Sequence, residues 1–341
     1  MLHFLLWPFS LLYRAATAVR NHLYDSGFKT SFEFERFVLS IGNLNVGGTG
    51  KTPMTEYLIR LLGEHYRIVT LSRGYGRKTR GYRIAGETDS ARTIGDEPYQ
   101  LFRKFPNIHV AVCEERAVGI PFILADYPDT DVILLDDAFQ HRPVKPQLSI
   151  MLTSFDKPFF QDWVLPAGRL RESRKGAARA DVIVVTKCPE TMPEKIRQGY
   201  VDKIRAYAPD TPVFFSRIAY RQPVGNNGRL KGKVVLFSGI ANPAQLRDYV
   251  DQHFEVVKEY TFRDHYPFNS DDIENLVNNA MREGASLLTT EKDFRRIPDE
   301  ALKTIEGQVP VYYLPIETVI DNGQEFDALI RNAIQEYVSA S

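Results

Sequence analysis

The stretch Asn45-Val46-Gly47-Gly48-Thr49-Gly50-Lys51-Thr52 decides the fold of this chain. It follows an apolar run at residues 36–41, which predicts a buried strand, and it precedes residues 52–62, where apolar side chains recur at helical spacing. A strand, a glycine-rich loop ending in Gly-Lys-Thr and a helix form the context of a phosphate-binding loop, or P-loop. Glycines let successive backbone amides point at an anion, and the helix N-terminus adds partial positive charge. We therefore expect residues 45–52 to hold the phosphates of a nucleotide.

Two side chains at the end of this loop carry the chemistry. Lys51 is expected to reach the β- and γ-phosphates, and the Thr52 hydroxyl is expected to bind Mg²⁺. The usual pattern has glycine five residues before Gly50, where this chain has Asn45. Because asparagine tolerates a positive φ, the loop is still expected to close. The alternative is an ordinary glycine-rich turn.

Composition limits the classes of function. A length of 341 residues suggests two domains with ample core. The chain has 43 basic and 43 acidic residues, so no global attraction to nucleic acid is expected. Its two cysteines, Cys113 and Cys188, exclude a disulfide framework and favour a reducing compartment. Neither belongs to a metal-ligand spacing.

The N-terminal residues 1–24 predict an amphipathic helix. Its apolar run is shorter than the roughly 20 residues that span a bilayer, and it lacks the features of a signal peptide. A helix lying in a membrane interface fits the pattern. The alternative is a helix that docks on the protein's own core. The apolar positions are Leu2, Leu5, Leu6, Phe9, Leu12, Tyr13, Ala16, Val19 and Leu23.

Acidic residues provide the second signal. The apolar run at residues 131–135 ends in Asp136-Asp137, which is how P-loop enzymes present a carboxylate to Mg²⁺. The alternative is a buried strand with a polar end. Gly95-Asp96-Glu97-Pro98 opens a helical segment in which Asp96 is expected at the N-cap, and this paired acid could also face the nucleotide.

Two basic segments, at residues 72–83 and 166–179, suggest anionic ligands, although solvated basic faces would look the same. Arginines beside a phosphate site can stabilise transferring charge. Thr186-Lys187-Cys188-Pro189 is similar to the base-reading corner of GTPases, but Pro189 stands where the guanine-selecting Asp would be. That difference weakens a GTP assignment.

Alternating strands and helices predict an α/β fold: a P-loop NTPase-like, mostly parallel sheet covered by helices over residues 25–224. A cluster of glycine, asparagine and charge suggests a linker into a smaller α/β domain at 225–310. The strand and helix within 311–341 are expected to return to the first domain. In the smaller domain, the loop pair Asp264-His265 is either structural or a proton relay.

Taken together, these stretches resemble the tetraacyldisaccharide 4'-kinase family of lipid A biosynthesis. The resemblance spans most of the chain, in order. The matching pieces are Gly42-Asn43 through Pro53, Ser72 to Arg77, Gly95 to Pro98, Asp136-Asp137 with Phe139 to Arg142, Pro166 to Glu172, Phe237 to Pro243, Asp264-His265 and Thr289 to Asp293.

The resemblance implies an ATP- and Mg²⁺-dependent peripheral enzyme on the cytoplasmic face of the inner membrane. By that resemblance it phosphorylates the 4'-hydroxyl of tetraacyldisaccharide 1-phosphate, a lipid A precursor. The resemblance further suggests Asp96 as the general base, assisted by His265 across a domain cleft, and Arg171 at the transferring phosphate. The Mg²⁺ ligands are expected among Thr52, Asp136, Asp137 and Glu97.

Two other classes of function fit parts of the sequence. A P-loop NTPase that inserts metals or matures another enzyme would share the glycine-rich loop, but it would usually show a Cys or His cluster, and the sequence shows none. A non-catalytic membrane adaptor would not need Lys51, Thr52 and Asp136 together.

Overall fold

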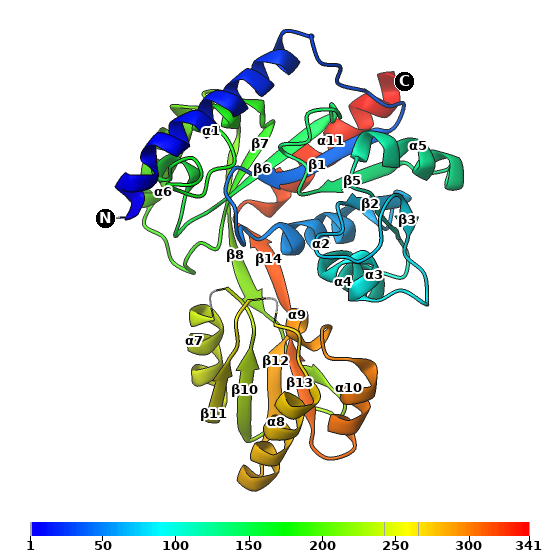
Figure 1. Cartoon of the computed structure of the whole chain (residues 1–341), viewed down its shortest axis with the longest axis vertical. Helices are drawn as coiled ribbons and strands as arrows, with labels where there is room; N and C mark the ends of the chain where they lie inside the picture. The colour runs from blue at the N-terminus through cyan, green and yellow to red at the C-terminus, as the bar shows by residue number, and fades with distance from the viewer. Residues whose placement is uncertain (1, 242, 265, 341) are drawn as a thin grey trace. The chain divides into compact units, whose positions relative to one another are not determined.

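The chain forms two compact units, shown with their elements in Figure 1. The computed structural model describes residues 2–241, 243–264 and 266–340. Unit 1 comprises Met1–Ile218 and Thr318–Ser341, and unit 2 comprises Ala219–Glu317. Each unit is built around its own sheet.

Within the described ranges, the sheet of unit 1 has nine strands in the order β14-β8-β7-β6-β1-β5-β2-β4-β3. The central pairs are parallel, and β3 pairs antiparallel with β4 at one edge. The strands are β1 (Phe37–Asn43), β2 (Ile68–Ser72), β3 (Arg83–Ile84), β4 (His109–Val112), β5 (Val132–Asp136), β6 (Leu148–Ser154), β7 (Val182–Thr186), β8 (Val213–Tyr220) and β14 (Ile316–Ile320).

Helices cover both faces of this sheet because its strands are apolar on both sides. Leu39 and Ile41 of β1 pack against α2 (Lys51–Leu62), α4 (Asp96–Lys104) and α11 (Gly323–Ala340). Val38 points to the other face, where it packs in a cluster with α5 (Arg116–Asp126). On that second face, a neighbouring cluster includes α6 (Glu194–Arg205) and the segment 159–170. Short helical turns complete unit 1 at α3 (Ala91–Ile94), η1 (Phe159–Gln161) and η2 (Arg174–Arg179).

The sheet of unit 2 has five strands in its described part, in the order β11-β10-β12-β13-β9. All neighbouring pairs are parallel except β13 with β9. The strands are β9 (Val224–Gly225), β10 (Lys233–Ser238), β11 (Glu255–Thr261), β12 (Ser286–Thr290) and β13 (Val311–Leu314). The helices are α7 (Ala244–His253), α8 (Ser270–Glu283), α9 (Glu291–Phe294) and α10 (Asp299–Glu306).

The unit boundaries differ from the expected ones in two places. The chain enters unit 2 at Ala219, within β8, rather than at residue 225. The strand at Val311–Leu314, expected in the first domain, instead pairs with β12 and β9 in unit 2. The return is made one strand later by β14, which lies at the edge of the nine-stranded sheet next to β8, and then by α11.

The N-terminal helix α1 (Leu2–Asp25) leaves several of its apolar side chains exposed, whereas Leu6 and Leu23 are half-buried. Phe9, Leu12 and Val19 are 60%, 69% and 60% exposed. This exposure favours a helix that lies in a membrane interface over the alternative of a helix that docks its apolar face on the core. Within the described ranges, no helix combines the length and apolar character that crossing a bilayer would require.

Candidate nucleotide site

The P-loop lies at the carboxyl edge of the large sheet, where β1, β5 and β7 all end. Gly47 and Gly50 adopt positive φ values of 118° and 82°, and Gly50 is the N-cap of α2. Asn43 Nδ2 donates to Thr49 Oγ1 at 2.6 Å, which ties the end of β1 to the loop. Because the first amides of a helix make no hydrogen bond within it, the start of α2 is suited to an anion.

Two residues at the end of β7 hold the backbone of the P-loop by hydrogen bonds. Thr186 Oγ1 donates to the Thr49 carbonyl at 2.8 Å, and Lys187 Nζ donates to the Gly48 carbonyl at 2.7 Å. Burial lowers the pKa of Lys187 from its ordinary value. The segment that is similar to a base-reading corner thus contacts P-loop backbone in this structure.

Asn45 has a structural role that differs from the expected one. Its φ is not among the positive values of the chain, so the tolerance of asparagine for a left-handed backbone is not used here. Instead, Asn45 Nδ2 donates to Asp162 Oδ2 at 3.0 Å, and the next residue, Val46, donates its amide to the Arg169 carbonyl at 2.7 Å. The first part of the P-loop is therefore held by the segment 162–172.

Asp137 brings two cations together beside the P-loop. Arg171 donates to both of its carboxylate oxygens, at 2.9 and 3.1 Å, and Lys51 Nζ lies 3.6 Å from Oδ1. Burial alone would raise the pKa of Asp137, but Lys51 and Arg171 hold that pKa below its usual value. Asp137 has a φ of 49°, a left-handed conformation that is strained for a residue with a side chain. Lys51, Arg171 and Asp137 are thus brought together.

Asp136 offers a place for a divalent cation. The residue is 7% exposed, and its Oδ1 is buried with no hydrogen-bond partner among the described residues. Burial raises the pKa of Asp136 to about 6, with Asp137 and Glu97 raising it further and Lys51 opposing them. A buried carboxylate oxygen without a donor suits Mg²⁺, which prefers oxygen ligands. The carboxylates present therefore fit the ion.

No group of three or more His, Cys, Asp or Glu side chains in the described ranges is arranged to hold a metal by itself. That finding agrees with Mg²⁺ sites in which one or two carboxylates act together with phosphate oxygens and water.

Helix α4 presents Asp96 and Glu97 near the start of α2. Gln100 donates to Glu56 at 2.8 Å, and the Arg60 guanidinium lies over the Phe105 ring, so the two helices run alongside each other in the same direction. Lys51 and Asp96, the first residues of the two helices, lie about one turn before Glu56 and Gln100. They therefore lie at the same end of this helix pair. The expectation that Asp96 is the N-cap is wrong, because Gly95 with φ 97° occupies that position and Asp96 begins the helix.

The two basic segments are less available to ligands than composition suggests. In residues 72–83, Arg77 pairs with Glu114 at 2.6 Å and Arg83 pairs with Asp89 at 2.7 Å. In the second segment, Arg169 pairs with Asp162 and Arg179 pairs with Glu172. Glu114, Asp89 and Asp162 lie outside the two basic segments, and Glu172 lies within the second one; because folding brings each acid to its arginine, the sequence pattern did not reveal the pairs.

In the first segment, Arg73 lies close enough to Arg116 and His141 for its charge to contribute to lowering the pKa of both. Burial is the main reason that the pKa of His141 falls to about 4, and its Nε2 accepts the Arg116 amide at 3.2 Å. His141 is therefore neutral at physiological pH.

The sequence did not single out Arg116, and it included Gln140 and Glu172 only as members of the matching pieces Phe139 to Arg142 and Pro166 to Glu172, without a role of their own. Arg116 is 3% exposed and donates to the carbonyls of Asp136 and Asp137 at 3.2 and 3.4 Å, which supports the strained turn. Gln140 and Glu172 link the carboxylate loop to the segment 162–172. Arg116 and Gln140 share one signal, since each follows a strand, β4 or β5, that ends at this edge of the sheet.

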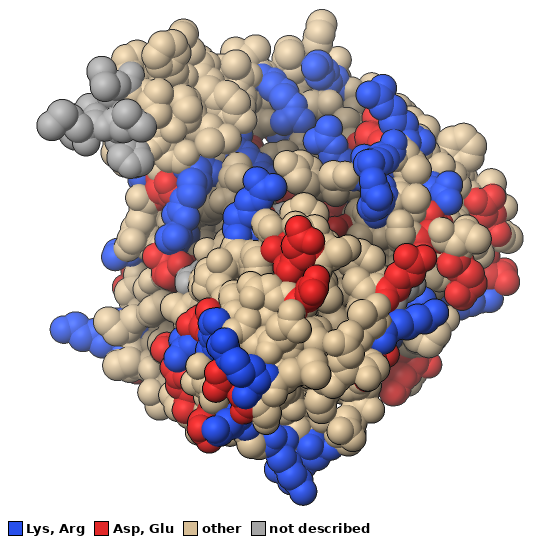
Figure 2. All heavy atoms as spheres, turned by 60° about the horizontal axis from the view of Figure 1, so that its bottom comes forward, with Lys and Arg blue, Asp and Glu red and all other residues tan. Residues whose placement is uncertain are grey.

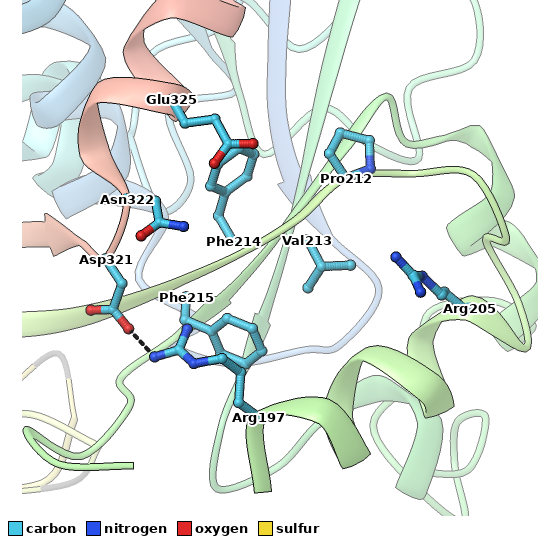
Figure 3. Close-up of a pocket in the computed structure, with 9 residues that line it drawn as sticks. All are labelled: Arg197, Arg205, Pro212, Val213, Phe214, Phe215, Asp321, Asn322 and Glu325. Carbon is cyan, nitrogen blue, oxygen red and sulfur yellow. Dashed lines mark hydrogen bonds and ion pairs between the residues drawn. The ribbon is translucent and has the colours of Figure 1, made fainter. Parts of the chain in front are cut away.

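Two other features stand apart from this site. A pocket of about 290 Å³, shown in Figure 3, lies among α6, β8 and the start of α11 and contains none of the predicted site residues. Its Arg197 is already paired with Asp321 at 2.5 Å. His265 lies outside the described residues. On the face shown in Figure 2, basic and acidic side chains are both scattered over the surface.

A mostly parallel sheet with a P-loop at its carboxyl edge and a buried carboxylate on the neighbouring strand defines a P-loop nucleotide-binding protein of the phosphoryl-transfer class. The family model described as tetraacyldisaccharide-1-P 4'-kinase matches residues 2–335. The chain belongs to this family.

Individual relatives agree with that assignment. The tetraacyldisaccharide 4'-kinase of Flavobacterium johnsoniae is 41% identical over 344 residues, which cover 98% of each chain. That of Bacteroides thetaiotaomicron is 41% identical over 95% of this chain and 90% of its own. The crystal structure of the "apo" form of LpxK from Aquifex aeolicus in complex with ATP superposes with a TM-score of 0.77 at 30% identity, covering 98% of this chain and 100% of that one.

Proposed function

We propose that this chain transfers the γ-phosphate of ATP to the 4'-hydroxyl of tetraacyldisaccharide 1-phosphate. The observation that carries the proposal is the meeting of Lys51, Arg171 and Asp137 beside the P-loop, with the buried Asp136 next to them, in a member of this kinase family. Two cations, a helix N-terminus and a buried carboxylate are the parts that phosphoryl transfer needs.

Each residue has a distinct role in the proposed reaction. The P-loop amides from Gly47 onward and the Lys51 ammonium hold the β- and γ-phosphates, whereas the Val46 amide stays bonded to the Arg169 carbonyl. Mg²⁺, when bound, would neutralise phosphate charge, and Asp136 with Thr52 would hold it, with Asp137 and Glu97 as further candidates. Phosphate oxygens compete with Asp137 for Arg171, so Arg171 can turn from this carboxylate to the transferring group.

Asp96 is the proposed general base. As the sugar hydroxyl attacks the γ-phosphorus, the bond between this phosphorus and the β,γ-bridging oxygen breaks and ADP leaves. The hydroxyl proton passes to the Asp96 carboxylate. A carboxylate at the start of α4, level with Lys51, is suitably placed because this chemistry depends mainly on positioning and charge. His265 remains a proposed partner in this proton transfer, and normal turnover by His265→Ala would remove it from the mechanism.

The membrane surface is the proposed place of action. The acceptor is an acylated lipid, and α1 exposes Phe9, Leu12 and Val19. Apolar side chains on one face of a surface helix favour insertion into the headgroup region. We propose that the enzyme binds peripherally to the cytoplasmic face of the inner membrane.

The test is transfer of labelled γ-phosphate from Mg-ATP to detergent-dispersed tetraacyldisaccharide 1-phosphate. Wild-type protein should label the lipid, whereas Lys51→Ala and Asp96→Ala should lower the rate at least a hundredfold while remaining folded. Thr17→Val on α1 serves as a control, because the Thr17 hydroxyl bonds only to carbonyls of its own helix. ATP binding without any labelled lipid would refute the proposed function.

A further inference from the structure

Helix α1 contacts the site through its polar side chains. Ser10 Oγ accepts the Ala167 amide at 2.9 Å, and the Tyr13 hydroxyl donates to the Arg171 carbonyl at 3.1 Å. Arg20 donates to the Gln140 carbonyl at 2.7 Å, and Asn21 Nδ2 donates to Glu172 Oε2 at 2.6 Å. These positions recur at helical spacing, so they form one face of α1 that packs on the nucleotide domain.

Glu172 links α1 to Gln140 and Arg179 through hydrogen bonds to its carboxylate. The residue is 2% exposed, and it accepts hydrogen bonds from Asn21, from both terminal nitrogens of Arg179 and from Gln140 Nε2 at 3.0 Å. A buried carboxylate that accepts several charged or polar donors has little freedom to move. Its position therefore sets the position of Gln140.

Gln140 connects this centre to the reacting end of the site. Its Nε2 also donates to the Asn43 carbonyl at 2.8 Å, directly before the P-loop, and its Oε1 accepts Arg171 NH1 at 3.3 Å. Arg171 in turn holds Asp137 next to Lys51. An unbroken series of contacts thus runs from α1 to the P-loop lysine.

We propose that Tyr13 and Asn21 are positioning residues for phosphoryl transfer: from the membrane-facing helix they orient Arg171 and Gln140 toward the phosphates. Tyr13 acts on the Arg171 backbone, and Asn21 acts through Glu172 and Gln140. Neither side chain touches the reacting atoms. The inference rests on the proposed function and deepens it, because the helix that meets the lipid also orients the site.

The first experiment measures kcat and KM for lipid phosphorylation on vesicles that contain the acceptor, for Tyr13→Phe, Asn21→Leu and the control Thr17→Val. We expect kcat to fall about fivefold for Tyr13→Phe and about tenfold for Asn21→Leu, with KM for the lipid and vesicle binding unchanged. Thr17→Val should retain wild-type kcat. Because Tyr13→Phe removes a single oxygen from a 38% exposed residue, it is expected to fold even if Asn21→Leu does not.

The second experiment is a double-mutant cycle with Arg171→Ala. If Tyr13 acts through Arg171, Tyr13→Phe has no further effect on kcat in the Arg171→Ala background, whereas a general loss of structure would reduce both backgrounds equally. Unchanged kcat in Tyr13→Phe, or an equal loss in both backgrounds, would overturn the inference.

A third measurement separates this inference from the proposed function. The binding of a non-hydrolysable Mg-ATP analogue can be measured without the lipid acceptor. The double-mutant cycle is therefore repeated with the affinity for this analogue as the readout. We expect Tyr13→Phe to weaken this affinity when Arg171 is present and to leave it unchanged in Arg171→Ala. A wild type that fails to phosphorylate the lipid overturns the proposed function alone, whereas an unaltered analogue affinity in Tyr13→Phe then overturns the inference.

Discussion

Helices α1 and α11 are both amphipathic and both belong to unit 1, yet they use their apolar faces in opposite ways. In α11, Phe326, Ile330 and Ile334 are at most 1% exposed and fill the core beneath the large sheet. In α1, Phe9 and Leu12 are among the most exposed side chains, and the polar face makes the contacts with the protein. The same kind of sequence pattern therefore serves stability in one helix and, in our proposal, membrane binding in the other.

The largest effect is expected from the buried face of α11. Phe326 is fully buried and packs against Phe214 and Tyr57. Phe326→Ala should lower the free energy of unfolding by about 3–5 kcal/mol, because it leaves a cavity in the core. Leu12→Ala on α1 is the matched control and should change stability by less than about 0.5 kcal/mol. Denaturant unfolding measures both, and equal losses would abolish the contrast between the helices.

The burial of Asp136, unlike that of the apolar residues of α11, lowers the stability of the folded protein at neutral pH. Its proposed role is to hold Mg²⁺. Since burial raises its pKa to about 6, the folded protein binds a proton more tightly than the unfolded chain does. Stability from this group is therefore fully present below pH 4 and is lost as pH rises to 6. Asp136→Asn should stabilise the nucleotide-free protein by about 1–3 kcal/mol at pH 8 and not at pH 4. Thermal unfolding at both pH values tests this sign, and a gain confined to low pH would contradict it.

The exposed face of α1 is expected to matter for lipid binding. Leu12→Ser should weaken binding to phosphatidylglycerol vesicles about tenfold, which matches the loss of part of one buried leucine side chain. The stability of the protein in solution should stay the same, since Leu12 is 69% exposed. Vesicle co-sedimentation provides the measurement. Unchanged co-sedimentation would mean that this face does not enter the bilayer.

The smallest effect is expected where α11 meets the P-loop helix. The Tyr57 hydroxyl of α2 donates to Asp327 Oδ1 at 2.6 Å, and both residues are half-buried. Tyr57→Phe removes this bond and should cost about 1 kcal/mol of stability without changing kcat. Urea unfolding combined with the phosphorylation assay tests the separation. A loss of activity would show that α11 also influences the site.

The sequence predicts the parallel sheet and its carboxyl edge well, because the signals there are local. The P-loop and the apolar run that ends in Asp136 each carry their pattern within about ten residues. The strands β8 and β14 are missing from the sequence-based expectations, because they are only partly buried and lack a continuous apolar run. Helix α5 contains Pro121, which obscures its helical pattern.

The site is predicted only in part for a similar reason. Lys51 and Asp136 belong to recognisable patterns, whereas the support that Arg116 gives to the carboxylate turn joins residues 20 positions apart. The contact between Asn21 and Glu172 spans 151 positions. No local pattern encodes such pairs. The orientation of α1 likewise depends on which face finds hydrogen-bond partners in the folded protein, and periodicity cannot supply that information.

The most direct test of the account asks whether the exposed face of α1 enters the bilayer while its polar face stays on the protein. The chain has two tryptophans, Trp7 and Trp163. When both are replaced by Phe and Leu12, which lies on the exposed face with Phe9 and Val19, is replaced by Trp, the sole tryptophan reports on that face, and its fluorescence can be measured with vesicles whose lipids carry bromine on their acyl chains. We predict strong quenching together with retained phosphorylation activity. Fluorescence that bromine does not quench, in an enzyme that still phosphorylates the lipid, would contradict the account.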